Sequence, residues 1–190
     1  TSNSYGVGGS MARFTLANER LYTVDNSNFN LFDVSSTRNP KFIKEIMIGW
    51  GIETIFPYKD KLFIGSNTGM YIYDVSSASN PTLISSYSHL NACDPVVVND
   101  DYAYVTLRTG AACGGVQNVL EVIDIKDLKN PKLLKSYQMK NPHGLALTGD
   151  FLYLCEGDFG LKSFGVKDVL NIDKNQIQYL ENLNSTDVIP

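Results

Sequence analysis

Three side chains suited to acid–base chemistry stand at one place in a repeated pattern. Glu53, Asp94 and His143 each lie nine residues before an apolar residue of a strand-like segment, and Ala12 takes that place in the first copy. Two carboxylates placed on either side of a glycosidic bond can act as acid and base in its cleavage. Two neighbouring carboxylates are common in proteins, however, so the spacing predicts a shared location more firmly than a reaction.

Other polar and aromatic residues are expected at the same location. Arg13 follows Ala12, and Arg108, Glu156 and Asp158 each follow a strand-like segment. Trp50, the only tryptophan, lies between two glycines, where it either stacks on a ligand or packs between neighbouring sheets. The candidate ligand-binding residues are therefore Arg13, Trp50, Glu53, Asp94, Arg108, His143, Glu156 and Asp158. The alternative is that these charged groups are only solvated or paired with one another.

The sequence offers no recognisable catalytic or metal-binding motif. His89 and His143 are far apart and neither has a second histidine at zinc-ligand spacing. The serines lack a nucleophile-elbow context. The glycines between residues 6 and 9 are not followed by a helix, so they do not form a phosphate loop. No catalytic residue, metal or cofactor is predicted.

The elements that must position these residues come from a fourfold repeat. Its most regular part reads LFDVSS at residues 31–36, IYDVSS at 72–77, VIDI at 122–125 and SFGV at 163–166. Asn-Pro follows in the first three copies and is lost in the fourth. The repeated Asp recurs after 41, 50 and 41 residues, with Gly165 in its place in the last copy. Short strands at a period of about 40–50 residues are typical of the blades of a β-propeller.

Each copy divides into four strands, A to D, which predicts an all-β chain with four four-stranded antiparallel blades. The expected blades are residues 11–48, 52–88, 94–139 and 143–183. Polar pairs such as Asn18-Glu19 and Lys59-Asp60 separate strands A and B and predict tight hairpins. In such a blade the D–A and B–C loops share one rim, and the candidate residues lie at this rim, in these loops or at the adjoining ends of strands A and B. Loops of this kind usually carry the binding sites.

The two ends predict how the blades relate to a whole ring. Val188-Ile189-Pro190 matches Ile55-Phe56-Pro57, so residues 186–190 read as the start of a further blade. Residues 1–10 are rich in Gly and Ser, as in a loop between strands. We interpret the chain as a single partial domain, four blades of a larger propeller. A complete four-bladed propeller is the alternative.

The repeat resembles the LVIVD repeat family of bacterial β-propellers. The resemblance covers nearly the whole chain and is closest at residues 91–96 (NACDPV), 102–108 (YAYVTLR) and 141–145 (NPHGL). It implies an exported protein of the cell envelope or surface of Bacteroides-type bacteria, often a lipid-anchored lipoprotein. It implies no particular activity.

Composition narrows the partners. The 190 residues carry a formal charge of −4 and no basic cluster, which argues against nucleic acid. No segment approaches the roughly 20 apolar residues of a transmembrane helix, and no signal peptide precedes the repeats. Export is therefore expected from the resemblance alone.

The three cysteines leave at least one unpaired within a monomer. Cys93 and Cys113 flank the same rim of the third blade, and a bond between them would close a loop of about 20 residues worth roughly 3 kcal/mol. Cys155 is expected to be a buried thiol. The alternative is that all three are reduced.

Two functions of different classes follow. The first is a non-catalytic recognition or scaffold propeller of the cell envelope, binding an unidentified protein or glycan through the rim. The second is an envelope hydrolase acting on a glycan or ester at the channel mouth. A cavity in which Glu53, Asp94 and His143 converge would favour the enzyme.

Overall fold

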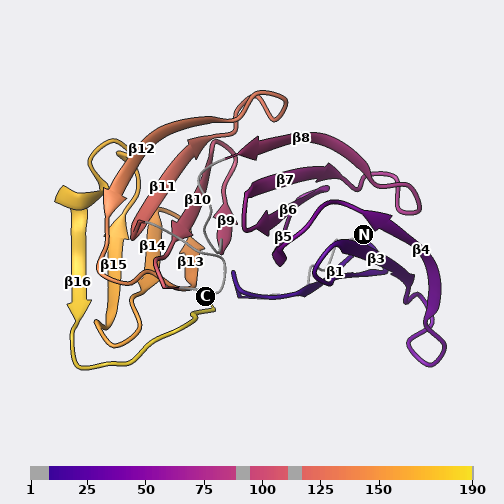
Figure 1. Cartoon of the computed structure of the whole chain (residues 1–190), viewed down its shortest axis with the longest axis horizontal. Coiled ribbons are helices and arrows are strands. Elements are labelled where there is room, and N and C mark those ends of the chain that lie inside the picture. Colours follow the sequence, from indigo (N-terminus) through magenta and orange to yellow (C-terminus); the bar gives the residue numbers. More distant parts are fainter. Residues whose placement is uncertain (1–8, 89–94, 111–116, 190) are drawn as a thin grey trace.

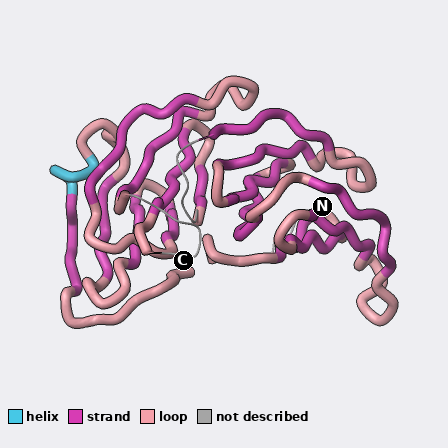
Figure 2. The backbone as a smooth tube through the Cα atoms, viewed as in Figure 1, coloured by secondary structure: helices cyan, strands magenta, loops and turns pink. Residues whose placement is uncertain are grey.

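The chain folds into four antiparallel sheets of four strands each. The computed structural model describes residues 9–88, 95–110 and 117–189. Within these residues there is no α-helix. The one helical element is a 3₁₀ turn, η1 (Ile172–Asn175), which is the cyan segment at the left of Figure 2. The all-β prediction is therefore confirmed.

Within each sheet the strands follow chain order from first to last, as in consecutive hairpins. The first blade contains β1 (Phe14–Ala17), β2 (Arg20–Val24), β3 (Asn28–Asp33) and β4 (Lys41–Met47). The second contains β5 (Ile52–Tyr58), β6 (Lys61–Ser66), β7 (Gly69–Asp74) and β8 (Thr82–Ser88). The third contains β9 (Val96–Val98), β10 (Tyr102–Leu107), β11 (Val119–Asp124) and β12 (Lys132–Gln138). The fourth contains β13 (Leu145–Thr148), β14 (Phe151–Cys155), β15 (Leu161–Gly165) and β16 (Gln176–Leu180).

The four blades fan out in an arc, with the first strand of each blade toward the centre and the last on the outside (Figure 1). The arc is open between the first and fourth blades, as Figure 1 shows. This is the arrangement of β-propeller blades. The innermost strands β1, β5, β9 and β13 therefore border a common central region, where their entrances come together.

The hairpins between the first two strands of the blades are tight, as predicted. Asn18 and Glu19 connect β1 to β2 with φ of 51° and 58°. Positive φ at both central residues is typical of a type I′ turn, whose twist matches that of the flanking strands. Asn tolerates this conformation at little cost, whereas Glu does not.

A bulge recurs at the same place in every blade, between the third and fourth strands. In the first blade Leu31 pairs with Lys44 and Phe32 with Phe42, which leaves Ile43 as the extra residue. The extra residues of the four blades are all aliphatic: Ile43, Ile84, Leu134 and Ile177. A bulge bends its strand and increases the local twist, so the repeat gives each outer strand the same curvature.

Apolar side chains form three cores, each between two adjacent blades. Tyr22, Phe29 and Leu31 of the first blade pack against Leu62 and Tyr73 of the second. Equivalent clusters join the second blade to the third and the third to the fourth. The second and third blades thus bury one face under the preceding blade and the other under the following one, whereas the first and fourth blades each share a core with one neighbour.

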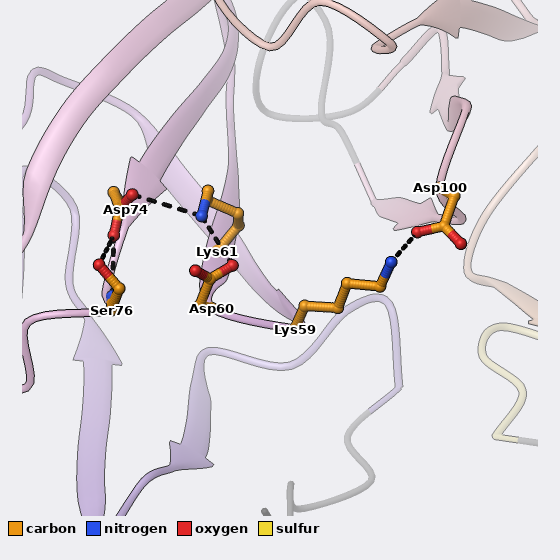
Figure 3. Close-up of polar contacts among 6 residues, drawn as sticks. All are labelled: Lys59, Asp60, Lys61, Asp74, Ser76 and Asp100. Carbon is orange, nitrogen blue, oxygen red and sulfur yellow. Dashed lines mark hydrogen bonds and ion pairs between the residues drawn. The ribbon is translucent and has the colours of Figure 1, made fainter.

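The repeated Asp closes the turn after the third strand. Asp74 Oδ1 accepts hydrogen bonds from the backbone N and the Oγ of Ser76, at 2.8 and 2.5 Å, and Asp74 Oδ2 lies 3.3 Å from Lys61 Nζ (Figure 3). Asp33 accepts the same two bonds from Ser35. In both turns the serine hydrogen bonds, foremost among the causes, lower the pKa of the aspartate. The most regular residue of the sequence is therefore structural.

Ion pairs and hydrogen bonds also connect neighbouring blades near their edges. Lys59 of the second blade pairs with Asp100 of the third, as Figure 3 shows. Lys44 Nζ donates to Asn80 Oδ1 at 2.9 Å, and Ser85 Oγ donates to the Leu128 carbonyl at 2.5 Å. These contacts link successive blades in addition to the apolar cores between them.

Cys155 is a buried free thiol, as the sequence predicts, and burial raises its pKa. The predicted disulfide partners Cys93 and Cys113 lie outside the described residues. None of the helical structure in the described ranges is long and apolar enough to cross a membrane.

Candidate functional site

One cavity lies at the central mouth of the blades. It is bordered by the starts of the inner strands β1, β5, β9 and β13 and by the end of β10. Its volume is about 280 Å³, and each blade contributes one charged or ionisable side chain to its lining: Arg13, Glu53, Arg108 and His143. Met11, Thr54, Pro95 and Pro142 complete the described lining. The structure thus brings four of the eight predicted site residues together at the channel mouth.

Backbone geometry places the first two of these side chains. Glu53 is the extra residue of a bulge in β5, because Ile52 pairs with Ser66 and Thr54 with Gly65. A bulge redirects the side chain at its position, which is why such irregularities occur beside functional sites. Arg13 precedes β1, and its Nη2 donates to the Ile52 carbonyl at 3.3 Å across the interface between the first two blades.

His143 is held by the backbone on both sides. Its N–H donates to the Cys155 carbonyl at 2.7 Å, and its own carbonyl accepts from Thr106 Oγ1 of the third blade at 2.6 Å. Arg108 Nη1 lies 3.4 Å and Asn141 Nδ2 3.2 Å from His143 Nε2. Both neighbours are donors, so Nε2 serves as an acceptor and the ring proton of the neutral imidazole is on Nδ1.

The surroundings shift both titratable groups of the cavity toward neutrality. Burial lowers the pKa of His143, and the Arg108 charge lowers it further, while Asp158 acts in the opposite direction. Burial raises the pKa of Glu53, against the effect of Arg13 and Arg108. The described lining therefore carries two permanent cations, one carboxylate and a neutral imidazole at neutral pH.

The remaining predicted residues lie elsewhere. Trp50 is 70% exposed, so its predicted alternative, packing between blades, is wrong, and it does not line the cavity. Asp158 is exposed and accepts a hydrogen bond from Asn184. Asp94 lies outside the described residues.

Glu156 follows β14 directly and is fully buried. Its Oε2 lies 2.5 Å from Lys162 Nζ, and its Oε1 accepts from the Lys140 backbone N at 2.6 Å. A buried carboxylate held by a cation and a backbone donor is engaged within the protein, so the geometry gives Glu156 a structural position.

Sequence reasoning missed the neighbours that shape the cavity. Asn141 and Pro142 directly precede His143, in the segment 141–145 where the resemblance to the LVIVD repeat is among the closest. Gly157 approaches the same site: a Cβ on it would lie 2.7 Å from Asn141 Nδ2 and 3.0 Å from His143 Nε2. The φ of Gly157, +58°, also favours glycine. The sequence shows a glycine here, but its positive φ and its approach to His143 become visible only in the folded structure.

A metal site does not emerge from the described part of the chain, where no three His, Cys, Asp or Glu side chains are grouped to hold an ion. A wider depression of about 540 Å³ lies on the fourth blade, beside Phe151 and Ile177. Its charged residues include the exposed pair Asp150 and Lys167, 3.3 Å apart, and it does not gather groups from several blades.

Four-stranded sheets with matched registers and a shared central mouth define a β-propeller, and comparison with known proteins agrees with this class. The LVIVD repeat model matches residues 60–89 and 91–139, so LVIVD repeats occur in the second and third blades. The search of curated proteins returned no match.

Solved structures with the same fold are distant in sequence. A computationally designed protein, Ika8, has a TM-score of 0.64 and 9% identity over 91% of this chain and 49% of its own. A functionally unknown protein from Desulfotomaculum acetoxidans has a TM-score of 0.61 and 14% identity over 97% of this chain and 54% of its own. The N-terminal domain of Nup159 has a TM-score of 0.54 and 13% identity, over 99% and 51%. The chain spans about half the length of these structures, and the likeness shows the fold alone.

Proposed function

We propose that this chain is a non-catalytic recognition or scaffold propeller that binds a glycan or protein through the rim formed by its D–A and B–C loops. The observation that carries the proposal is the cavity to which all four blades contribute, through Arg13, Glu53, Arg108 and His143. Concave sites with a few convergent polar groups are where proteins usually bind ligands. The bacterial cell envelope is the proposed location, on the resemblance of the repeats.

Binding to purified envelope material tests the proposal. The chain is immobilised and exposed to separated glycan and protein fractions of a bacterial envelope, beside an Arg13→Ala/Arg108→Ala double variant. We expect the wild-type chain to retain a component that the double variant does not. Arg38→Ala is the matched control, because Arg38 is an exposed arginine in the turn between β3 and β4. Retention that is equal in all three proteins would reject the rim as the binding surface.

The second candidate is hydrolysis of a glycan or ester at the same mouth. It is favoured by one observation: Glu53, whose pKa is raised by burial, and the neutral His143 line one cavity. A carboxyl group with a raised pKa is suited to general acid catalysis. The two arginines beside Glu53 oppose this shift, and no second carboxylate is found among the described lining residues. Chromogenic glycosides and esters, assayed with wild type and Glu53→Gln, test the candidate through release that depends on Glu53.

A further inference from the structure

The described cavity lining is positive although the protein as a whole is acidic. Arg13 and Arg108 contribute two positive charges and Glu53 one negative charge, which leaves a net charge of +1 with His143 neutral. The whole chain has a formal charge of −4. The positive lining attracts an anion, whereas the rest of the negatively charged surface repels it, so anions are expected to concentrate at this cavity.

The geometry of the arginines favours a planar anion. Each guanidinium presents a fork of N–H donors that matches a carboxylate, which can accept two parallel bonds. Arg13 is anchored by the Ile52 carbonyl and Arg108 lies beside His143, so both heads are positioned before a ligand arrives. Preorganised donors lose little entropy on binding.

The rest of the lining favours a hydroxylated ligand with one charge. The Glu53 carboxylate is an acceptor for hydroxyl groups, and it repels a dianion more strongly than a monoanion. Pro95 and Pro142 supply short apolar walls. At about 280 Å³ the cavity is just below the roughly 300 Å³ at which the usual range for ligand sites begins, which suits a ligand no larger than one sugar-sized unit.

We infer that this cavity binds a sugar acid, a monosaccharide-sized ligand or chain terminus whose carboxylate is held between Arg13 and Arg108. The inference rests on the proposed recognition function and deepens it by naming the ligand class. It requires no covalent step and no cofactor.

Titration with free sugars tests the ligand class. The probes are glucuronate, glucose as its neutral counterpart and glucose 6-phosphate as a dianion, each followed by NMR chemical-shift changes of the full chain. We expect glucuronate to bind at least about ten-fold more tightly than either other sugar. Arg13→Gln and Arg108→Gln should each weaken glucuronate binding by about ten-fold or more, whereas the control Arg38→Gln should leave it unchanged. Circular dichroism and melting temperature establish that each variant is folded.

The outcomes separate this inference from the proposed function. Equal binding of glucose and glucuronate, or tighter binding of glucose 6-phosphate, overturns the sugar-acid assignment and leaves a rim that recognises ligands. Absence of glucuronate binding to folded wild type also overturns it. If the envelope fractions are then retained equally by wild type and the Arg13→Ala/Arg108→Ala variant, the proposed function fails as well.

Discussion

His143 makes the stability of the protein sensitive to mild acid. Its pKa in the folded state is lowered by burial and by Arg108, so the unfolded chain takes up a proton first as the pH falls. The stability contribution of the neutral imidazole is therefore complete above about pH 6.5, the unperturbed value, and is lost below it. Glu53 has the opposite effect on stability. Because its pKa is raised in the folded state, the folded protein gains stability as the pH falls and Glu53 takes up a proton.

Replacing His143 by Gln should reduce this acid sensitivity. The amide keeps a hydrogen-bonding group beside Arg108 and Asn141 but does not titrate. We expect the melting temperature of wild type to fall more than that of His143→Gln between about pH 7.5 and pH 5.5. An equal fall in both proteins would mean that His143 does not control acid stability, and Glu53→Gln, measured in parallel, isolates the opposing contribution.

The repeated Asp contributes stability rather than chemistry, and Asp74 is its best-connected copy. Asp74→Ala removes both hydrogen bonds to Ser76 and the contact with Lys61, and we expect a loss of about 1 kcal/mol in urea unfolding, because the site is largely exposed and the charge is screened. Asp60→Ala is the control: it removes the other partner of Lys61 but leaves the turn intact (Figure 3). A larger loss at Asp60 than at Asp74 would contradict the structural role of the motif.

The stability that Asp74 contributes also depends on pH. Because the pKa of Asp74 is lowered in the folded state, this contribution is present above the unperturbed pKa of about 3.9 and is lost as the pH falls through the folded value.

At the scale of elements, strand positions could be predicted well from the sequence because hairpins constrain them. The repeat and its turns predict strands at residues 61–66, 102–107, 132–138 and 176–180, and the structure has strands with these bounds. The recurring bulge was missed, although an aliphatic residue ten positions after the Asp marks it in three copies, at Ile43, Ile84 and Leu134. A one-residue change of pairing is invisible to a period-two pattern. In the fourth copy η1 occupies the connection between β15 and β16, where Asn-Pro is absent.

The candidate site was predictable only as a set of matched positions. Equal spacing from the innermost strands placed Glu53 and His143 on one rim, and the structure puts both in one cavity. Spacing carries no information on burial, so it did not distinguish the buried Glu156 from the exposed Trp50. Those differences arise from tertiary contacts such as that between Glu156 and Lys162.

The β1–β2 hairpin holds a residue that its conformation does not suit. Glu19 has a φ of 58°, a region that costs a non-glycine residue about 1 kcal/mol. We expect Glu19→Gly to raise the free energy of unfolding by roughly 0.5–1 kcal/mol, since the turn geometry stays the same. Glu45→Gly, an exposed change within β4, should destabilise by a similar amount. Denaturant unfolding of both variants checks the two opposite signs.

The backbone of Gly157, in the fourth blade, lies close to His143 of the cavity lining. Gly157→Ala adds a Cβ that meets Asn141 and His143, so we expect the imidazole to move and glucuronate binding to weaken. Gly149→Ala is a matched control, because it has a similar φ of +56° but open space around its Cβ. Both variants should lose about 1–2 kcal/mol of stability from the left-handed backbone. Equal glucuronate affinity in the two variants would show that Gly157 does not position His143.

At the scale of the whole molecule, the outer face of the first blade is exposed where the other blades are covered. Phe14 is 61% exposed, whereas the residues in its register position, Ile55, Val96 and Leu145, are at most 1% exposed. Leu16 is 43% exposed, against 4% for its counterpart Val98. In each later blade the residue at the Phe14 position packs in the core shared with the blade before it, so the first blade presents an inter-blade surface to solvent.

Such a surface predicts self-association of this chain, since contiguous exposed apolar patches on a sheet are sites of protein association. We expect the double variant Phe14→Thr/Leu16→Thr to sediment as a smaller species than wild type over a concentration series and to bind less of a hydrophobic dye. Its free energy of unfolding should change by less than about 1 kcal/mol in total, because both side chains are already in water. Ile55→Thr, the same kind of change at a covered position, should cost about 2–4 kcal/mol by burying a hydroxyl and leaving a cavity. If wild type is monomeric throughout the series, or if Phe14→Thr/Leu16→Thr destabilises as much as Ile55→Thr, then the first blade does not use this face as the other blades use theirs.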